Sequence, residues 1–300
     1  MKIAITGSTG LVGTALSKHW GATHVVLPAG RGPASAPASV WDPAAGWIRP
    51  GAFEGVDAVV HLAGASIATG RWTAERKAEL VASRVEATRL LVAHLSTLER
   101  KPSLLISASA VGYYGSRASE VLDETAAPGD DFLAKLCVDW EHEALAAEAA
   151  GIRTVIFRLG VIMAREGGAL PKMLTPIKLG VGGKLGSGRQ WMPWVSMRDV
   201  VGAHDFVLGR PAAKGVYNLT APEPATNATF TKALGKAVHR PTVMAVPALA
   251  LKAMLGAEAA QGMLLCSQRV VPRRLEAEGF GFVDRKPAEA FAALFGPVAR

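Results

Sequence analysis

Short apolar runs alternate with amphipathic helical patterns over the first half of the chain. The runs have the composition of buried strands and lie at residues 3–6, 24–27, 57–64, 103–107 and 153–159. A helical pattern follows the first run, and longer ones extend from about 73 to 98 and from about 131 to 149. This alternation predicts an α/β fold in which right-handed crossovers build a doubly wound parallel sheet.

The alternation ends after Gly160. Residues 180–191 are rich in glycine but lack the Gly-Lys-Ser/Thr end of a phosphate-binding P-loop, so we expect a mobile lid over about 165–195. Trp191 and Trp194 are expected either to press on a ligand or to pack this segment against the core. Short helical patterns separated by proline and glycine follow Pro222. We therefore expect a first domain over residues 1–220 and a small C-terminal lobe over 221–300.

Glycines at every third position follow the first predicted strand. Gly7 permits a tight turn, Gly10 lets backbone N–H groups approach a phosphate, and Gly13 lets the next helix pack closely on the strand. Because this turn joins a strand to a helix, it predicts a site for the pyrophosphate of a dinucleotide. The residues expected to contact the pyrophosphate are Gly7, Thr9, Gly10, Leu11, Val12 and Gly13.

The residues around the second predicted strand indicate which dinucleotide binds. Folds that prefer NAD place an acidic residue there to bind the ribose 2′-hydroxyl, but residues 14–41 contain no Asp or Glu. Arg31 follows this strand, next to a Pro/Ala/Gly/Ser-rich segment over 32–39 that predicts a surface loop. A guanidinium can pair with a 2′-phosphate, so we expect NADP(H) rather than NAD(H). The alternative is that Arg31 is a solvated loop cation.

Composition narrows the class of protein. The chain has 300 residues, half of them hydrophobic, which suffices for a large folded core. The net charge is +8, but we expect dispersed basic residues and no nucleic-acid partner, because aromatic residues are not interleaved with them. The seven histidines have no paired ligand spacing, so no metal site is expected.

The expected compartment is the cytoplasm. The two cysteines, Cys137 and Cys266, are too few for a disulfide framework and fit a reducing environment. No secretory leader precedes the first strand, and the apolar run over 246–251 is too short to span a bilayer. We therefore expect a soluble protein without a membrane partner.

Further short strings of residues with a distinctive sequence occur over nearly the whole chain. They include Leu62-Ala63-Gly64, Arg71-Trp72, the stretch from Ser107 to Gly115, Asp139-Trp140-Glu141, the stretch from Gly188 to Trp191, and Gln268-Arg269-Val270. With the glycine turn, they resemble the extended short-chain dehydrogenase/reductase superfamily, and more closely an atypical NAD(P)-dependent epimerase/dehydratase-like family within it. The resemblance implies a Rossmann domain that binds NADPH, a small C-terminal lobe, and a homodimer paired through the helices that start near Thr73 and Asp131.

The resemblance also implies cofactor contacts outside the glycine turn. These come from Arg31, Leu62, Ala63, Gly64, Glu79, Arg84, Ser107 and Val161. Glu79 and Arg84 lie five residues apart on a predicted helix, so from the residues alone they could equally be exposed helical charges.

The chain departs from the catalytic pattern that the resemblance implies. The superfamily uses a Tyr, a Lys four residues later, and a Ser or Thr that polarises the substrate oxygen. Ser109 occupies the Ser position, whereas Leu133 and Cys137 occupy the Tyr and Lys positions. Lys135 cannot replace the missing Lys, because two residues along a helix turn the side chain by roughly 200°.

Two phenols remain near Ser109. Tyr113 and Tyr114 lie on the segment after the fourth predicted strand, and each is either a general acid or a packing residue. One hypothesis is an NADP(H)-dependent oxidoreductase or epimerase, in which Ser109 and one of these phenols orient a carbonyl or hydroxyl group of a small-molecule substrate. The other is a nucleotide-binding sensor or regulator without turnover. We expect the substrate in a cleft between the C-terminal lobe and the carboxyl edge of the sheet.

Overall fold

The computed structural model describes residues 1–32, 35 and 40–296, so most of the loop expected over 32–39 lies outside the described residues. The chain forms two compact units. The sheet unit contains residues 1–109, 136–157 and 204–216, and the second unit contains 110–135, 158–203 and the chain from 217 onward. The sequence analysis instead places one domain boundary near residue 220.

A six-stranded sheet organises the sheet unit, with the strand order β13-β8-β6-β5-β1-β2. The strands are β1 (Lys2–Thr6), β2 (Val25–Ala29), β5 (Ala58–His61), β6 (Leu104–Ala110), β8 (Arg153–Leu159) and β13 (Gly215–Leu219). β1 pairs in parallel with β2 and β5, and β5 pairs in parallel with β6. The central strands are almost wholly buried because both faces of the sheet are covered. The predicted α/β class with a parallel sheet is confirmed.

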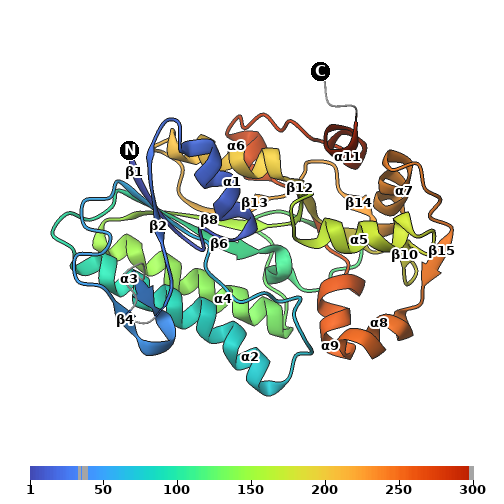
Figure 1. Ribbon diagram of the computed structural model, residues 1–300, viewed down its shortest axis with the longest axis horizontal. Helices are drawn as coiled ribbons and strands as arrows, with labels where there is room; N and C mark the ends of the chain where they lie inside the picture. The colour runs from blue at the N-terminus through green and yellow to red at the C-terminus, as the bar shows by residue number, and fades with distance from the viewer. Residues whose placement is uncertain (33–34, 36–39, 297–300) are drawn as a thin grey trace. The chain divides into compact units, whose positions relative to one another are not determined.

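Helices cover both faces of this sheet (Figure 1). α1 (Leu11–Trp20) and the C-terminal part of α6 (Met197–Leu208) lie on one face, where Trp20 Nε1 donates a hydrogen bond to Asp205 Oδ1 at 2.6 Å. α3 (Ala87–Thr97) and α4 (Phe132–Leu145) lie on the other face. The sheet is therefore doubly wound, as the sequence predicts.

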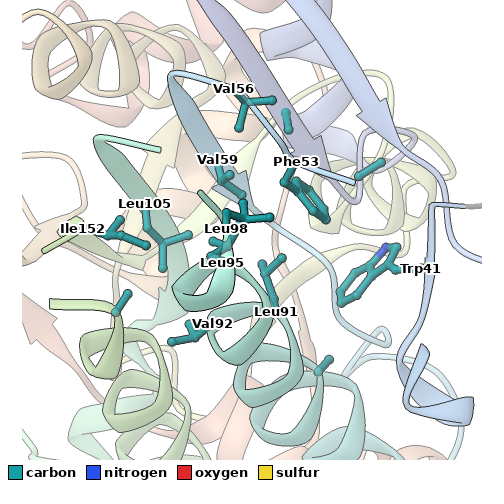
Figure 2. Packing of buried hydrophobic residues seen from close by; sticks show 14 residues of the cluster. Trp41, Phe53, Val56, Val59, Leu91, Val92, Leu95, Leu98, Leu105 and Ile152 are labelled. Atoms are coloured by element: carbon teal, nitrogen blue, oxygen red, sulfur yellow. The ribbon is translucent and has the colours of Figure 1, made fainter. Parts of the chain in front are cut away.

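Large apolar side chains fill the space between the sheet and α3 (Figure 2). Leu91 and Leu95 of α3 belong to one buried cluster with Val59 of β5 and Leu105 of β6. Trp41 lies at one side of the cluster. It belongs to a small antiparallel pair, β3 (Trp41–Asp42) and β4 (Trp47–Ile48), that the apolar pattern does not predict.

The long helix expected from about residue 73 contains a π-helical turn. α2 (Ala74–Val81) follows Thr73, whose side chain accepts a hydrogen bond from Arg76 N at 3.2 Å and caps the helix. A π-helical turn over Ala82–Glu86 then joins α2 to α3. Such turns add a residue to the helix and rotate the side chains that follow, and they are frequent at functional sites.

The second unit consists of helices and short strand pairs. Its helices are α5 (Ala169–Lys178), α7 (Asn227–Ala237), α8 (Ala248–Leu255), α9 (Ala257–Ala260), α10 (Arg273–Ala277) and α11 (Pro287–Phe295). Its strand pairs are β7 (Val121–Leu122) with β16 (Arg269–Val270), β9 (Val161–Met163) with β12 (Trp194–Ser196), β10 (Gly183–Leu185) with β15 (Met244–Val246), and β11 (Trp191–Met192) with β14 (Ala225–Thr226). The segment expected as a lid thus contains α5 and strands that pair with other segments; its mobility stays a prediction.

Three aromatic rings lie in the core of the second unit, among aliphatic side chains. Trp194 is buried and lies 6.2 Å from Phe230, which in turn lies 5.0 Å from Phe291, measured between ring centroids. Trp194 therefore packs its segment against the core, which was one of its two expected roles. Trp191 is half-buried, and the Arg269 guanidinium lies 4.6 Å from its ring centroid.

Candidate functional site

The turn after β1 is tightly packed against the end of β5. Gly7 has a φ of +69°, and a Cβ atom on it would lie 2.9 Å from the carbonyl group of Leu62. A Cβ atom on Gly13 would overlap the carbonyl oxygen of Gly7. Both positions therefore require glycine, which is the packing that the sequence analysis expects at a dinucleotide turn.

The N-terminus of α1 is open at this turn. Gly10 is the N-cap residue, no side chain among the described residues caps the helix, and its first turn holds no acidic residue. Thr9 and Gly10 are exposed. The N–H groups of the first helical turn therefore have no side-chain acceptor among the described residues, and the positive end of the helix favours an anion there.

Arg31 lies at the same edge of the sheet, two residues after β2. Its backbone forms an isolated bridge with Trp41, while its side chain is exposed. Within residues 1–32, 35 and 40–296, the Arg31 guanidinium has no ion-pair partner. An unpaired cation at the same sheet edge as an open helix N-terminus fits a phosphorylated ribose.

Buried hydrogen bonds join three segments at this edge. Leu62 N donates to Thr6 Oγ1 at 3.2 Å, and Thr6 Oγ1 lies 2.7 Å from His61 Nδ1. On the other side of the ring, His61 Nε2 lies 3.0 Å from Thr88 Oγ1, which donates to Arg84 O. Burial lowers the pKa of His61 to about 4, so the ring is neutral at pH 7. The bonds are all satisfied if Thr6 donates to Nδ1 and Nε2–H donates to Thr88.

Arg84 projects from the π-helical turn toward the loop after β5. Its Nη2 donates to Ala65 O at 2.9 Å, and its guanidinium carbon lies 5.3 Å from the ring centroid of Trp140. A Cβ atom on Gly64 would lie 3.2 Å from that carbon, so glycine leaves room for the guanidinium. Burial lowers the pKa of Arg84, with a smaller opposing effect from the nearby Cys137.

Glu79 has a different environment from Arg84. Its carboxylate is exposed and forms an ion pair with Arg76, which also donates to Ser66 O. The sequence analysis misses Arg76, which attaches α2 to the loop after β5. A cofactor contact from Glu79 stays a prediction.

Ser109 lies at the end of β6 and is hydrogen-bonded to α4. Its Oγ donates to Glu141 Oε1 at 2.6 Å, and the two residues are 2% and 6% exposed. Cys137 lies one helical turn before Glu141 on α4, and both Cys137 and Leu133 are buried. The sequence analysis misses Glu141 as the partner of Ser109, although it singles out the string Asp139-Trp140-Glu141. Ser107 is also buried on β6, and its Oγ donates to Ala108 O at 3.2 Å.

The two phenols belong to the second unit and differ from each other. Tyr114 is fully buried; its hydroxyl lies 2.7 Å from Asn218 Oδ1 and accepts a hydrogen bond from Arg158 Nη1 at 3.0 Å. Burial raises the pKa of Tyr114 to about 12. Tyr113 is half-buried, with the Arg158 guanidinium 3.3 Å from its ring centroid. Its hydroxyl has no hydrogen-bond partner within the described chain.

Val161, the last predicted cofactor contact, lies in the second unit. It begins β9 and pairs with Trp194 of β12. Among the described residues, no group of three His, Cys, Asp or Glu side chains is arranged to hold a metal ion. None of the helices in the described ranges combines the length and the apolar character needed to cross a membrane.

Comparison with protein families gives two matches along the chain. Residues 3–220 match the NAD dependent epimerase/dehydratase family. Residues 246–294 match a domain of unknown function, DUF1731. The first match covers more than half of the chain and includes every residue of the sheet edge described above.

Individual proteins match over almost the full length. The epimerase family protein Mb2239 of Mycobacterium bovis is 43% identical over 290 residues, which cover 96% of this chain and 95% of that protein. A crystal structure of human epimerase family protein SDR39U1 (isoform 2) with NADPH superposes with a TM-score of 0.87 at 31% identity, covering 99% of this chain and 100% of that chain. A nucleoside-diphosphate sugar epimerase from Corynebacterium glutamicum gives a TM-score of 0.80 at 32% identity, covering 99% of this chain and 58% of that chain.

Proposed function

Because the chain belongs to the NAD dependent epimerase/dehydratase family, we propose that it binds NADP(H) at the carboxyl edge of its six-stranded sheet and acts as an oxidoreductase or epimerase of the short-chain dehydrogenase/reductase type. The observation that carries the proposal is the open N-terminus of α1 behind the Gly7 turn. The human relative was crystallised with NADPH, which supports the choice of nucleotide.

The residues at this edge suit the parts of the proposed cofactor. The backbone from Gly7 to Gly13 would hold the pyrophosphate, and Arg31 would pair with the 2′-phosphate. Leu62, Ala63 and Gly64 would line the edge beside the turn. When bound, the nicotinamide would supply a hydride donor or acceptor, and the remaining task of the chain is to position the substrate.

Ser109 is the proposed group that orients the substrate. Its hydroxyl hydrogen is directed to Glu141, so its oxygen is left to accept a hydrogen bond. This arrangement favours a substrate that presents a hydroxyl group to Ser109. The contacts of Tyr114 favour a structural role, because its hydroxyl is engaged and its raised pKa makes it a poor acid. Tyr113, whose hydroxyl is unpartnered in the described chain, is the better candidate for proton transfer.

A second candidate function is an NADPH-binding sensor without turnover. The buried Leu133 and Cys137 at the usual Tyr and Lys positions support it, because neither can serve as the phenol and ammonium pair of the superfamily. Three further parts belong to the proposal. They are a small-molecule substrate, a homodimer paired through the helix that runs from α2 into α3 and through α4, and a cytoplasmic location in which Cys137 and Cys266 stay reduced.

Turnover of a substrate separates the two candidates. Purified protein is incubated with NADPH or NADP⁺ and a panel of sugar nucleotides, aldehydes, ketones and alcohols. Nicotinamide absorbance detects an oxidoreductase, and chromatography of the products detects an epimerase, which regenerates its cofactor. Turnover that falls in Ser109→Ala supports the enzyme. Tight NADPH binding without turnover on any substrate supports the sensor, and a Ser109→Ala variant with the native rate eliminates the role of Ser109.

A further inference from the structure

The net positive charge of the chain arises from two segments of the second unit. Residues 167–198 and 224–257 together contain nine Lys and Arg residues and no Asp or Glu. The rest of the chain has 24 basic and 25 acidic residues. The whole excess of the net charge therefore lies in these two segments, which is less dispersed than the sequence analysis expects.

The fold brings the two segments together. β10 pairs in parallel with β15, so that Lys184 lies opposite Ala245. Leu185 N donates to Asn227 Oδ1 at 2.8 Å, and Ala228 N donates to Gly188 O at 2.9 Å, so the start of α7 is also tied to the first segment. No acidic residue interrupts this surface on α7, β10, β15 or the loop that joins α7 to β15.

A groove of about 540 Å³ lies between α7, β10 and the loop after α7. Four cations line it: Lys184 from β10, Lys232 and Lys236 from one face of α7, and Arg240 from the loop. All four are exposed, and none forms an ion pair with a described residue. Lys232 and Lys236 are one helical turn apart, where like charges destabilise a helix. Unpaired cations that converge on a concave surface favour an anionic ligand.

We propose that this groove binds an anionic ligand through one or more phosphate groups. Its volume lies within the range of small-molecule sites. The hydroxyl groups of Thr231 and Thr242 add donors that suit phosphate oxygens. The cations are mostly lysines, which are depleted at protein–protein interfaces but common where phosphates are bound.

Exposed apolar residues beside the groove are relevant to which kind of molecule carries the phosphate. Val243 lines the groove at 85% exposure, and Met244 beside it is 51% exposed. Leu249 and Met254 on α8, which follows β15, are 79% and 71% exposed. The phosphate can therefore belong to a soluble phosphate ester or to the headgroup of an anionic lipid, and the experiment has one arm for each source.

The soluble arm titrates inorganic pyrophosphate into the full-length protein by calorimetry, at fixed ionic strength, with and without saturating NADPH. NADPH occupies the proposed site at the glycine turn, so binding that persists in its presence belongs elsewhere. Lys232→Glu/Lys236→Glu is compared with Lys172→Glu/Lys178→Glu, which makes the same charge change on α5 outside the groove.

In the lipid arm, the native protein and the two variants are sedimented with phosphatidylcholine vesicles, with and without phosphatidylglycerol. Circular dichroism checks that both variants are folded.

We expect saturable binding of one pyrophosphate that is weakened at least about tenfold by the groove variant and by less than about twofold by the control. Binding only to vesicles that contain phosphatidylglycerol, lost in the groove variant and retained in the control, also supports the site and assigns its source to lipid. Absence of binding to both probes overturns the proposal. Equal weakening in the two variants overturns it as well, because general charge attraction then explains the binding.

Discussion

Ser109 Oγ donates a 2.6 Å hydrogen bond to Glu141 Oε1, and Glu141 lies one helical turn after Cys137, the residue that the sequence analysis aligns with the Lys of the superfamily. Because Glu141 takes up the hydroxyl hydrogen, Ser109 can only accept a hydrogen bond from a substrate. The bond also buries a carboxylate at the carboxyl end of β6, which requires a partner to be stable there. The same hydroxyl is thus expected to serve both stability and substrate positioning.

Ser109→Ala is expected to destabilise the protein by about 1–3 kcal/mol, because it leaves Glu141 with one hydrogen bond fewer in a buried site. The measurement is the free energy of unfolding from urea titration. Ser103→Ala is the control, since Ser103 is exposed and donates only to Asp57 O, and a change within about 0.5 kcal/mol is expected there. Equal losses in the two variants would argue against a stabilising Ser109–Glu141 bond.

Gly13→Ala is expected to cost about 1–3 kcal/mol of stability and to weaken NADPH binding, because the new methyl group would overlap Gly7 O in the turn. Gly209→Ala is the matched control in the sheet unit, where a Cβ atom would make only an ordinary 3.5 Å contact with Asp205 O. Unfolding and NADPH titrations are measured on both. A Gly13→Ala protein with native affinity would refute the tight turn as the pyrophosphate site.

His61 is expected to make the protein acid-sensitive. Its pKa is about 4 when buried, against an ordinary value of 6.5, so the unfolded chain takes up a proton at a higher pH than the folded chain. The contribution of His61 to the free energy of unfolding is therefore complete above about pH 6.5. It falls as the pH drops toward 4, by as much as roughly 3 kcal/mol.

The free energy of unfolding is measured against pH for the native protein and for His61→Gln. Carboxylates titrate in both proteins, so the difference between the two isolates the contribution of His61. The difference in unfolding free energy between the two proteins should narrow as the pH falls from about 6.5 to 4. A constant difference over that range would mean that the His61 ring does not resist protonation.

Tyr113 and Tyr114 are expected to respond differently to loss of their hydroxyls. Tyr114→Phe removes the partner of Asn218 and Arg158 in a buried site and should cost about 1–3 kcal/mol. Tyr113→Phe should leave stability within about 0.5 kcal/mol and lower any turnover, since its hydroxyl has no partner among the described residues. A stable Tyr114→Phe protein that has lost turnover would reverse this assignment.

The sheet was predictable because its strands are apolar runs bounded by loop residues. The observed β8 (Arg153–Leu159) coincides with its predicted range, and β5 and β6 differ from theirs only at the ends. The resemblance to the epimerase family is confirmed as well. These features depend on local composition and spacing, which a single sequence contains.

Other features depend on contacts between distant segments and could not be read from spacing. The π-helical turn that directs Arg84 toward Ala65 has no signal in the apolar pattern. The Ser109–Glu141 bond joins residues 32 positions apart on a strand and a helix. The groove lined by Lys232 and Lys184 forms where β10, which pairs with β15, is also hydrogen-bonded to the start of α7.

The central claim is that Arg31 selects NADP(H) at the edge beside the α1 N-terminus. It is tested most directly by titrating NADPH and NADH into the native protein and into Arg31→Ala, with Lys18→Ala as a control for general charge. NADPH should bind at least about tenfold more tightly than NADH to the native protein, and Arg31→Ala should remove most of that preference by weakening NADPH alone. Equal or tighter binding of NADH to the native protein, or an equal loss for both nucleotides in Arg31→Ala, would contradict the claim.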